Sequence, residues 1–168
     1  MNNSSRLSDK LNKLKQSGKK ALVAYIVAGD PQPELTVPLM HKLAASGVDV
    51  IELGVPFSDP EAEGPVIQLA HQRALKFNIS LNDCLTMVAK FREQDKETPV
   101  VLMGYLNPIE AMGYGVFATR ARDAGVNGTI IVNLPPEEAG ELGPLLAEHH
   151  IDTVYLLAPT TTDDRALM

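Results

Sequence analysis

The sequence has no tryptophan and one cysteine, Cys84, and aromatic residues make up 5% of its 168 positions. A single cysteine excludes an internal disulfide, and its place in a helical run over 81–91 favours a core residue over a reactive thiol. No apolar run approaches the roughly 18 residues of a membrane span, and residues 1–20 lack the apolar centre of a signal peptide. We therefore expect a cytoplasmic protein in a reducing compartment, with no membrane contact.

Positive charge is also scarce. The net charge of -6 argues against binding to a phosphate backbone, and no Lys/Arg cluster is interleaved with aromatic residues, so nucleic acid is not an expected partner. His41 and His71 stand singly and His149 and His150 are adjacent with diverging side chains, so we expect no metal site. A nucleotide-binding enzyme has no support either, because the sequence has neither a Gly-x-Gly-x-x-Gly nor a Walker-type loop.

What the chain does have is a regular alternation of apolar strands and helices. With 45% hydrophobic and 21% charged residues and no linker, it reads as one domain over 1–168. The expected strands are 21–28, 49–55, 99–105, 128–132 and 153–157. The expected helices are a short amphipathic one over 7–14, then 34–46, 65–75, 81–93, a stretch ending at 124, and 137–149. This pattern predicts a parallel α/β sheet, either doubly wound or part of a β/α barrel.

One of these strands carries a carboxyl group in apolar surroundings. With a period of two, Val50, Glu52 and Gly54 share one face of the strand, so Glu52 points where a β-branched side chain normally packs. Apolar surroundings disfavour the charged form and raise the pKa of a carboxyl, which suits a general acid. A structural ion pair with a Lys or Arg of a neighbouring strand is the open alternative. The proline- and glycine-rich loop that follows, 56–65, favours a site, because its backbone is constrained at the carboxyl end of a strand.

The chain also resembles a known family. Residues 28–31, 52–65, 99–108 and 157–161 resemble successive motifs of the tryptophan synthase α chain, in order and over about residues 7–168. The resemblance implies a TIM-type β/α barrel of eight strands, of which this chain would hold about five. It also implies cleavage of indole-3-glycerol phosphate to indole and glyceraldehyde 3-phosphate, with indole passed to a β chain that carries pyridoxal phosphate. No cofactor is implied for this chain itself.

The same resemblance assigns two catalytic carboxyl groups. Glu52 matches the glutamate that protonates the indole ring carbon and assists deprotonation of the glycerol hydroxyl. Glu63 occupies the place of an aspartate in the pattern Ser-Asp-Pro-x-Ala-Asp-Gly, which accepts the indole N–H and stabilises positive charge on the ring. The added methylene moves the carboxylate by about 1 Å, a misplacement that can cost about a hundredfold in rate.

Further positions follow from the resemblance alone. Three match residues that line the indole pocket, and core packing is their plain alternative: Tyr25, Met103 and Tyr105. Four more fall in loops that face the β chain, although as bare sequence they are turn formers: Asp59, Pro60, Asn107 and Pro108. Asn133 departs from the family, where an aspartate is usual.

The number of strands leaves the function open. Thr162, Asp163 and Asp164 read as the opening of a helix that would still be running at Met168, and the family's phosphate-binding glycine loops come from later strands. We therefore expect an incomplete barrel with a weak hold on the substrate phosphate. Three hypotheses remain: the lyase itself, a catalytically impaired module that only docks on a β chain, and an unrelated doubly wound α/β binding domain.

Overall fold

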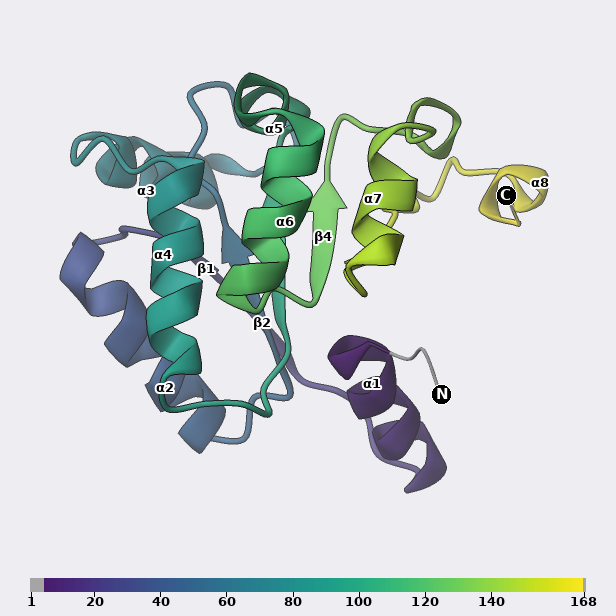
Figure 1. Ribbon diagram of the computed structural model, residues 1–168, viewed down its shortest axis with the longest axis horizontal. Helices are drawn as coiled ribbons and strands as arrows, with labels where there is room; N and C mark the ends of the chain where they lie inside the picture. The colour runs from purple at the N-terminus through teal and green to yellow at the C-terminus, as the bar shows by residue number, and fades with distance from the viewer. Residues whose placement is uncertain (1–4, 168) are drawn as a thin grey trace.

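The computed structural model describes residues 5–167 and shows one parallel sheet (Figure 1). Its strands are β1 (Val23–Val27), β2 (Val50–Gly54), β3 (Val100–Gly104), β4 (Gly128–Ile131) and β5 (Asp152–Thr153). They pair in the order β1-β2-β3-β4-β5, each parallel to its neighbour. In a β/α barrel, neighbouring strands of the sheet follow one another along the chain. In a doubly wound sheet, the strand order reverses at a switch point. The five predicted strands are confirmed, and the doubly wound alternative is wrong.

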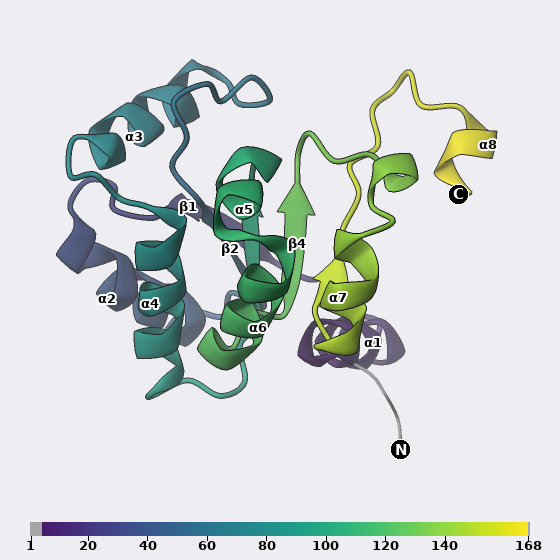
Figure 2. The same ribbon diagram turned by 45° about the horizontal axis from the view of Figure 1, so that its top comes forward.

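A layer of helices covers the outer face of the sheet. Figure 2 shows α2 (Thr36–Ala45), α4 (Leu81–Arg92), α6 (Tyr114–Ala124) and α7 (Leu142–Glu148) side by side. Their apolar faces meet the outward residues of the central strands in one core, to which Leu53, Leu102, Phe91 and Phe117 belong. Cys84 is fully buried in this core with a free thiol, as predicted, and burial raises the pKa of that thiol. None of the helices within residues 5–167 is long and apolar enough to cross a membrane.

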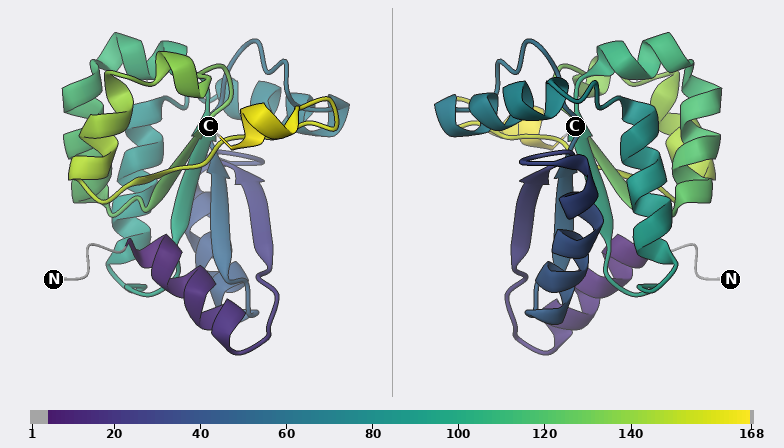
Figure 3. Two further views of the ribbon diagram at one scale, coloured as in Figure 1. Left: turned by 90° about the vertical axis from the view of Figure 1, so that its right-hand side faces the viewer. Right: turned by 90° about the vertical axis from the view of Figure 1, so that its left-hand side faces the viewer.

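The inner face is closed at one end by the N-terminal helix α1 (Arg6–Gln16), as Figure 3 shows. Leu7 packs against Val50, Val101 and Ile130, which point inward from three adjacent strands. The Ser8 hydroxyl donates a hydrogen bond of 3.0 Å to the Asp152 carboxylate and fixes the helix to β5. The predicted amphipathic helix is confirmed. Because it covers the amino ends of the strands, the carboxyl ends form the opposite rim.

Helix α3 (Pro65–Leu75) and the 3-10 turn η1 (Pro33–Leu35) lie toward that rim, and α8 (Asp163–Ala166) follows β5. Ser80 and Asp83 form a capping box at the start of α4, since each side chain binds the backbone N–H of the other residue. The predicted start of α8 is confirmed, because the Thr162 hydroxyl accepts a hydrogen bond of 3.4 Å from the Arg165 N–H. The helix ends at Ala166 and was therefore predicted too long; Met168 itself lies outside the described residues.

Three predicted elements were wrong in extent. The stretch ending at 124 is two helices, α5 (Leu106–Met112) and α6, separated by Gly113 at a φ of 88°. The predicted helix 137–149 is a 3-10 turn η2 (Pro136–Glu138) followed by α7. Pro144 explains this break, because a ring inside a continuous helix would remove an N–H and clash with the preceding turn. The fifth strand is shorter than predicted. Its pairing with β4 ends at Thr153, and beyond it the Val154 N–H donates one more hydrogen bond, to the Thr129 carbonyl.

Candidate active site

The residues predicted on the inner face lie there. Glu52 pairs in register with Tyr25 of β1, and Met103 of β3 pairs with Gly54, two residues beyond Glu52. Met103 is half-buried against the inner apolar cluster that includes Val50. Because side chains alternate along a strand, Tyr25, Glu52 and Met103 all face the barrel interior. The common face expected for Val50 and Glu52 is therefore confirmed, and it is the inner face of the sheet.

Glu52 is a half-buried carboxyl on the inner face of β2. Burial raises its pKa above the ordinary glutamate value. Among residues 5–167, no Lys or Arg pairs with it, so the alternative of a structural ion pair is wrong for this part of the chain. A desolvated carboxyl without a cationic partner holds its proton closer to neutral pH, which is the property required of a general acid.

Glu63, in the loop between β2 and α3, is held by a tyrosine. The Tyr105 hydroxyl donates a hydrogen bond of 2.6 Å to Glu63 Oε2, and the Glu63 side chain is 5% exposed. The same hydroxyl accepts a hydrogen bond of 3.0 Å from the Ala62 N–H. Burial and the bond to Glu63 raise the pKa of Tyr105 to about 12, so the phenol keeps its proton at neutral pH. Tyr105 therefore anchors the Glu63 carboxylate as a hydrogen-bond donor.

The loop that carries Glu63 is fixed by further contacts. The Phe57 and Tyr105 rings stack with centroids 4.7 Å apart and an angle of 21° between their planes. From α3, the Gln68 amide donates a hydrogen bond of 2.9 Å to the Glu63 carbonyl. In the loop after β1, Asp30 forms a two-pronged pair with Arg73 at 2.6 and 2.9 Å, which ties α3 to this loop. These contacts hold the loop from both sides, as its proline and glycine content predicted.

Tyr25 is the neighbour of Glu52 in the register of β1 and β2. Burial raises the pKa of its hydroxyl, and the negative charges of Glu63 and Glu52 raise it further. This hydroxyl is also 3.3 Å from Nε2 of His71, a nitrogen that lies 4.0 Å from Glu63 Oε1. Gly54 makes room for it, since a Cβ at this position would collide with the tyrosine oxygen. Tyr25 therefore brings Glu52 of β2 and Glu63 of the loop into one site.

Sequence reasoning missed His71, which belongs to the same site. It lies on α3, is 1% exposed, and accepts a hydrogen bond of 3.0 Å from the Phe57 N–H at Nδ1. Its Nε2 is 3.3 Å from the Tyr25 hydroxyl and 4.0 Å from Glu63 Oε1. The sequence held one signal for this role of His71. The residue directly follows Ala70, which lies on the apolar face of α3 that packs against β1. A histidine at the edge of such a face points toward the sheet.

The buried imidazole predicts a pH effect on stability. Burial lowers the pKa of His71, and the nearby Glu63 carboxylate opposes part of that shift, while Tyr25 presents a neutral hydroxyl. In the unfolded chain, the His71 imidazole has an ordinary pKa of about 6.5. As the pH falls, the unfolded state therefore binds a proton before the folded state does. The contribution of His71 to the free energy of unfolding is therefore complete above about pH 6.5. It is lost as the pH falls from there through the lowered folded-state pKa.

Denaturant unfolding near neutral pH and at about one pH unit below 6.5 measures this loss. His71→Gln does not titrate, so its unfolding free energy should fall less between the two conditions. An equal fall in the wild type and the variant would contradict the assignment.

The four residues predicted at a partner interface lie on the same rim. Asp59 is exposed and Pro60 half-buried in the loop after β2. Asn107 and Pro108 were expected in a loop, but they form the first turn of α5. Proline is tolerated in that turn because its missing N–H would have no partner within the helix. Asn133 supports this turn, since its Oδ1 accepts a hydrogen bond of 2.8 Å from the Leu106 N–H.

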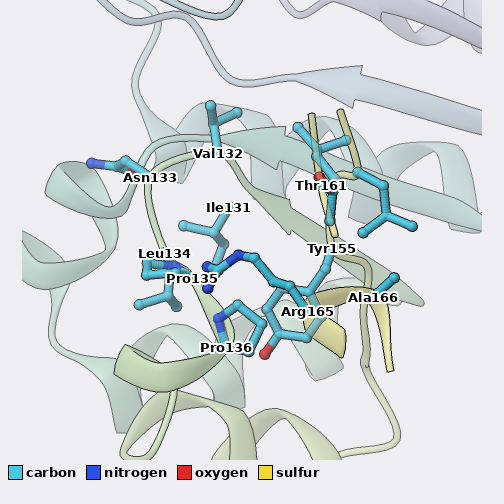
Figure 4. Close-up of a pocket in the computed structure, with 12 residues that line it drawn as sticks. Ile131, Val132, Asn133, Leu134, Pro135, Pro136, Tyr155, Thr161, Arg165 and Ala166 are labelled. Atoms are coloured by element: carbon cyan, nitrogen blue, oxygen red, sulfur yellow. The ribbon is translucent and has the colours of Figure 1, made fainter. Parts of the chain in front are cut away.

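A separate pocket lies between the turn after β4 and the segment after β5 (Figure 4). It has a volume of about 330 Å³, and the Arg165 side chain, paired with Glu137, lies across it. None of the residues lining it is a candidate catalytic residue. Within the described chain, no group of three His, Cys, Asp or Glu side chains is arranged to hold a metal ion. The acid/base cluster on the inner rim is therefore the candidate active site.

Comparison with known sequences gives matches over nearly the whole chain. A family model described as tryptophan synthase alpha chain matches residues 11–168. The tryptophan synthase alpha chain of Marinobacter nauticus is 62% identical over 161 residues, which cover 96% of this chain and 60% of that protein. The alpha chain of Acinetobacter baumannii is 58% identical with the same coverage of both chains. The chain thus spans about 60% of the length of these curated relatives.

Solved structures agree in fold. The crystal structure of tryptophan synthase subunit alpha from Legionella pneumophila matches with a TM-score of 0.92 and 56% identity, covering 96% of this chain and 62% of that one. A tryptophan synthase complex from Pyrococcus furiosus contains a chain that matches with a TM-score of 0.82 and 41% identity, covering 86% of this chain and 59% of that one. The parallel strands β1 to β5 therefore form part of a TIM-type barrel.

Proposed function

Because the chain belongs to the tryptophan synthase alpha chain family, we propose that it carries the acid/base centre for retro-aldol cleavage of indole-3-glycerol phosphate. The products are indole and glyceraldehyde 3-phosphate. One observation carries the proposal: Tyr25 pairs in register with the half-buried Glu52, and its hydroxyl is 3.3 Å from His71 Nε2, which lies 4.0 Å from Glu63 Oε1 at the same barrel rim. Two carboxyl groups in different environments suit an acid/base pair.

The reaction requires two proton movements at the bond that breaks. A proton is added to the indole ring carbon that carries the glycerol side chain, and the adjacent hydroxyl loses its proton as its oxygen becomes the aldehyde. The electrons of the broken carbon–carbon bond return to the ring. Glu52 suits both movements, because burial shifts its pKa upward from the ordinary glutamate value, and a carboxyl shifted toward neutral pH can both give and take a proton.

Glu63 supplies the complementary negative charge. Positive charge develops on the indole ring when its carbon is protonated, and a carboxylate that accepts the indole N–H stabilises that charge. The Tyr105 bond occupies Glu63 Oε2, which leaves Oε1 for the substrate. Tyr25, Met103 and Tyr105 would line the indole pocket, because the first two face the barrel interior and Tyr105 lies at its mouth.

The test is product analysis. Purified protein incubated with indole-3-glycerol phosphate should release indole and glyceraldehyde 3-phosphate in equal amounts. Disappearance of substrate with a different product would contradict the proposal. We propose no cofactor in this chain for this step, with pyridoxal phosphate confined to the β partner. A cytoplasmic location is part of the same proposal, and cell fractionation tests it.

Docking on a β chain is the second proposed activity, and a specific surface favours it. Asp59 and Pro60 lie close to the first turn of α5, which carries Asn107 and Pro108, because Tyr105 links the two segments through its bond to Ala62. A tryptophan synthase complex is among the matching structures. If this rim is the interface, binding to a β chain occurs whether or not cleavage is observed.

Asp59→Arg is expected to weaken β-chain binding by about tenfold or more, because charge reversal at an interface brings unfavourable charges together. Glu97→Arg is the matched control. Glu97 is exposed before β3, at the opposite end of the barrel, and should leave the affinity unchanged. Calorimetric or surface-based titration of both variants against a β chain measures the effect. Equal weakening by the two variants would show a general charge effect and no docking at Asp59.

A further inference from the structure

His71 has a defined tautomer in this site. Its Nδ1 accepts a hydrogen bond of 3.0 Å from the Phe57 N–H, so Nδ1 carries a lone pair. The single ring proton of the neutral imidazole therefore lies on Nε2. Burial lowers the pKa of the imidazole, which agrees with the neutral form. His71 thus presents one N–H donor toward the barrel rim.

That donor faces two groups of the proposed active site. Nε2 is 3.3 Å from the Tyr25 hydroxyl and 4.0 Å from Glu63 Oε1. The first distance makes the tyrosine oxygen the acceptor, which leaves the hydroxyl proton free to donate toward the interior. The second distance is too long for a hydrogen bond, so the Nε2–H acts on the Glu63 carboxylate by electrostatic attraction across the gap.

A glutamate needs such a second contact more than a shorter acid does. Its extra methylene adds one freely rotating bond, and the Tyr105 hydroxyl fixes only Oε2. The oxygen that would meet the substrate, Oε1, is the one opposite His71. An error of about 1 Å in the position of a reacting group can cost about a hundredfold in rate.

We propose that His71 is a positioning residue that sets the Glu63 carboxylate and the Tyr25 hydroxyl for the reaction through its Nε2–H. The inference rests on the proposed lyase function, because it concerns the same site. His71 touches no substrate atom in this role. It orients two groups. One is the Glu63 carboxylate, which accepts the indole N–H, and the other is the Tyr25 hydroxyl beside Glu52.

A second role competes with this one. The bond from Phe57 to Nδ1 fixes the start of the loop that carries Glu63, so His71 has a structural role whatever its other nitrogen does. Two substitutions separate the roles. In His71→Asn the amide oxygen lies near the place of Nδ1 and retains the Phe57 contact, but no donor remains at Nε2. In His71→Gln the amide nitrogen lies near the place of Nε2 and retains the donor, but the Phe57 acceptor is lost.

Positioning predicts that His71→Asn lowers kcat by about 10- to 100-fold with little change in KM or melting temperature. His71→Gln should retain kcat within a few-fold while melting at a lower temperature. The proposal is overturned if His71→Asn matches the wild type in kcat, or if both variants lose activity in proportion to their loss of stability. If the wild type itself releases no indole, the proposed function fails instead, which is a different outcome.

A spectroscopic measurement tests the contact without turnover. In protein with ¹⁵N-labelled histidine, one imidazole should show the neutral Nε2–H tautomer, and Glu63→Gln should shift its signals. A His71 signal of the Nδ1–H tautomer, or one that Glu63→Gln leaves unchanged, would overturn the proposal.

Discussion

Glu52→Gln is expected to lower indole release by about 10²- to 10⁴-fold, the usual effect of removing a general acid or base. Glutamine keeps nearly the same shape on the inner face of β2, but it neither gives nor takes a proton. Tyr25 cannot replace Glu52 as a base, because the pKa of its hydroxyl is raised and the phenol stays protonated at neutral pH. The effect should appear in kcat, with little change in KM, since the pocket is unaltered.

The same substitution is expected to stabilise the fold. Burial raises the pKa of Glu52, so the folded state is penalised wherever that carboxyl is ionised, at pH values above its ordinary range. Removing the charge should raise the unfolding free energy near neutral pH by about 0.5–2 kcal/mol, the common gain from relieving a strained active site. Glu97→Gln removes an exposed charge and should change stability little. A destabilised Glu52→Gln would mean that the carboxylate has a favourable partner in the fold.

Glu63→Gln is expected to lower kcat by about 10²- to 10³-fold, comparable to the loss of one electrostatic stabiliser of a transition state. The amide oxygen of glutamine still accepts the Tyr105 bond, so the loop should keep its place. What is lost is the negative charge opposite the protonated indole ring. Kinetics with a melting curve for each variant measures the two effects separately.

Glu63→Asp is the matched control, because it keeps the charge and shortens the side chain. The carboxylate withdraws by about 1 Å, the distance over which rate is sensitive, and takes the place expected of the aspartate in this family. We expect kcat at or above that of the glutamate enzyme, despite the lost Tyr105 bond. Equal loss in Glu63→Asp and Glu63→Gln would show that the reach of the glutamate, and not its charge alone, is required.

The sequence was sufficient for the existence of all five strands, although not for the extent of the last one, and for the direction of Glu52. A strand has a period of two whatever surrounds it, so the face shared by Val50 and Glu52 followed from position alone. Helix extents were less certain because they depend on single residues. Gly113 and Pro144 each end or delay a helix, and an apolar pattern that runs across them gives no warning.

The contacts that make the site were beyond sequence reasoning, because they join residues far apart in the chain. Tyr105 and Glu63 are 42 residues apart, and His71 is 46 residues from Tyr25. No local pattern encodes such a meeting; it follows from barrel curvature and the docking of α3. The roles of Glu52 and Glu63 came from the resemblance to a family, and the structure adds the environment that suits them to those roles.

The most direct test of the acid/base assignment is indole release from indole-3-glycerol phosphate, measured for the protein alone and with a β chain, with Glu52→Gln as the blank. We expect the wild type to release indole and the variant to lower that release by at least about a hundredfold in both conditions. Equal release by wild type and variant would contradict the assignment of Glu52, and no release in either condition, with β-chain binding intact, would leave docking as the function of this surface.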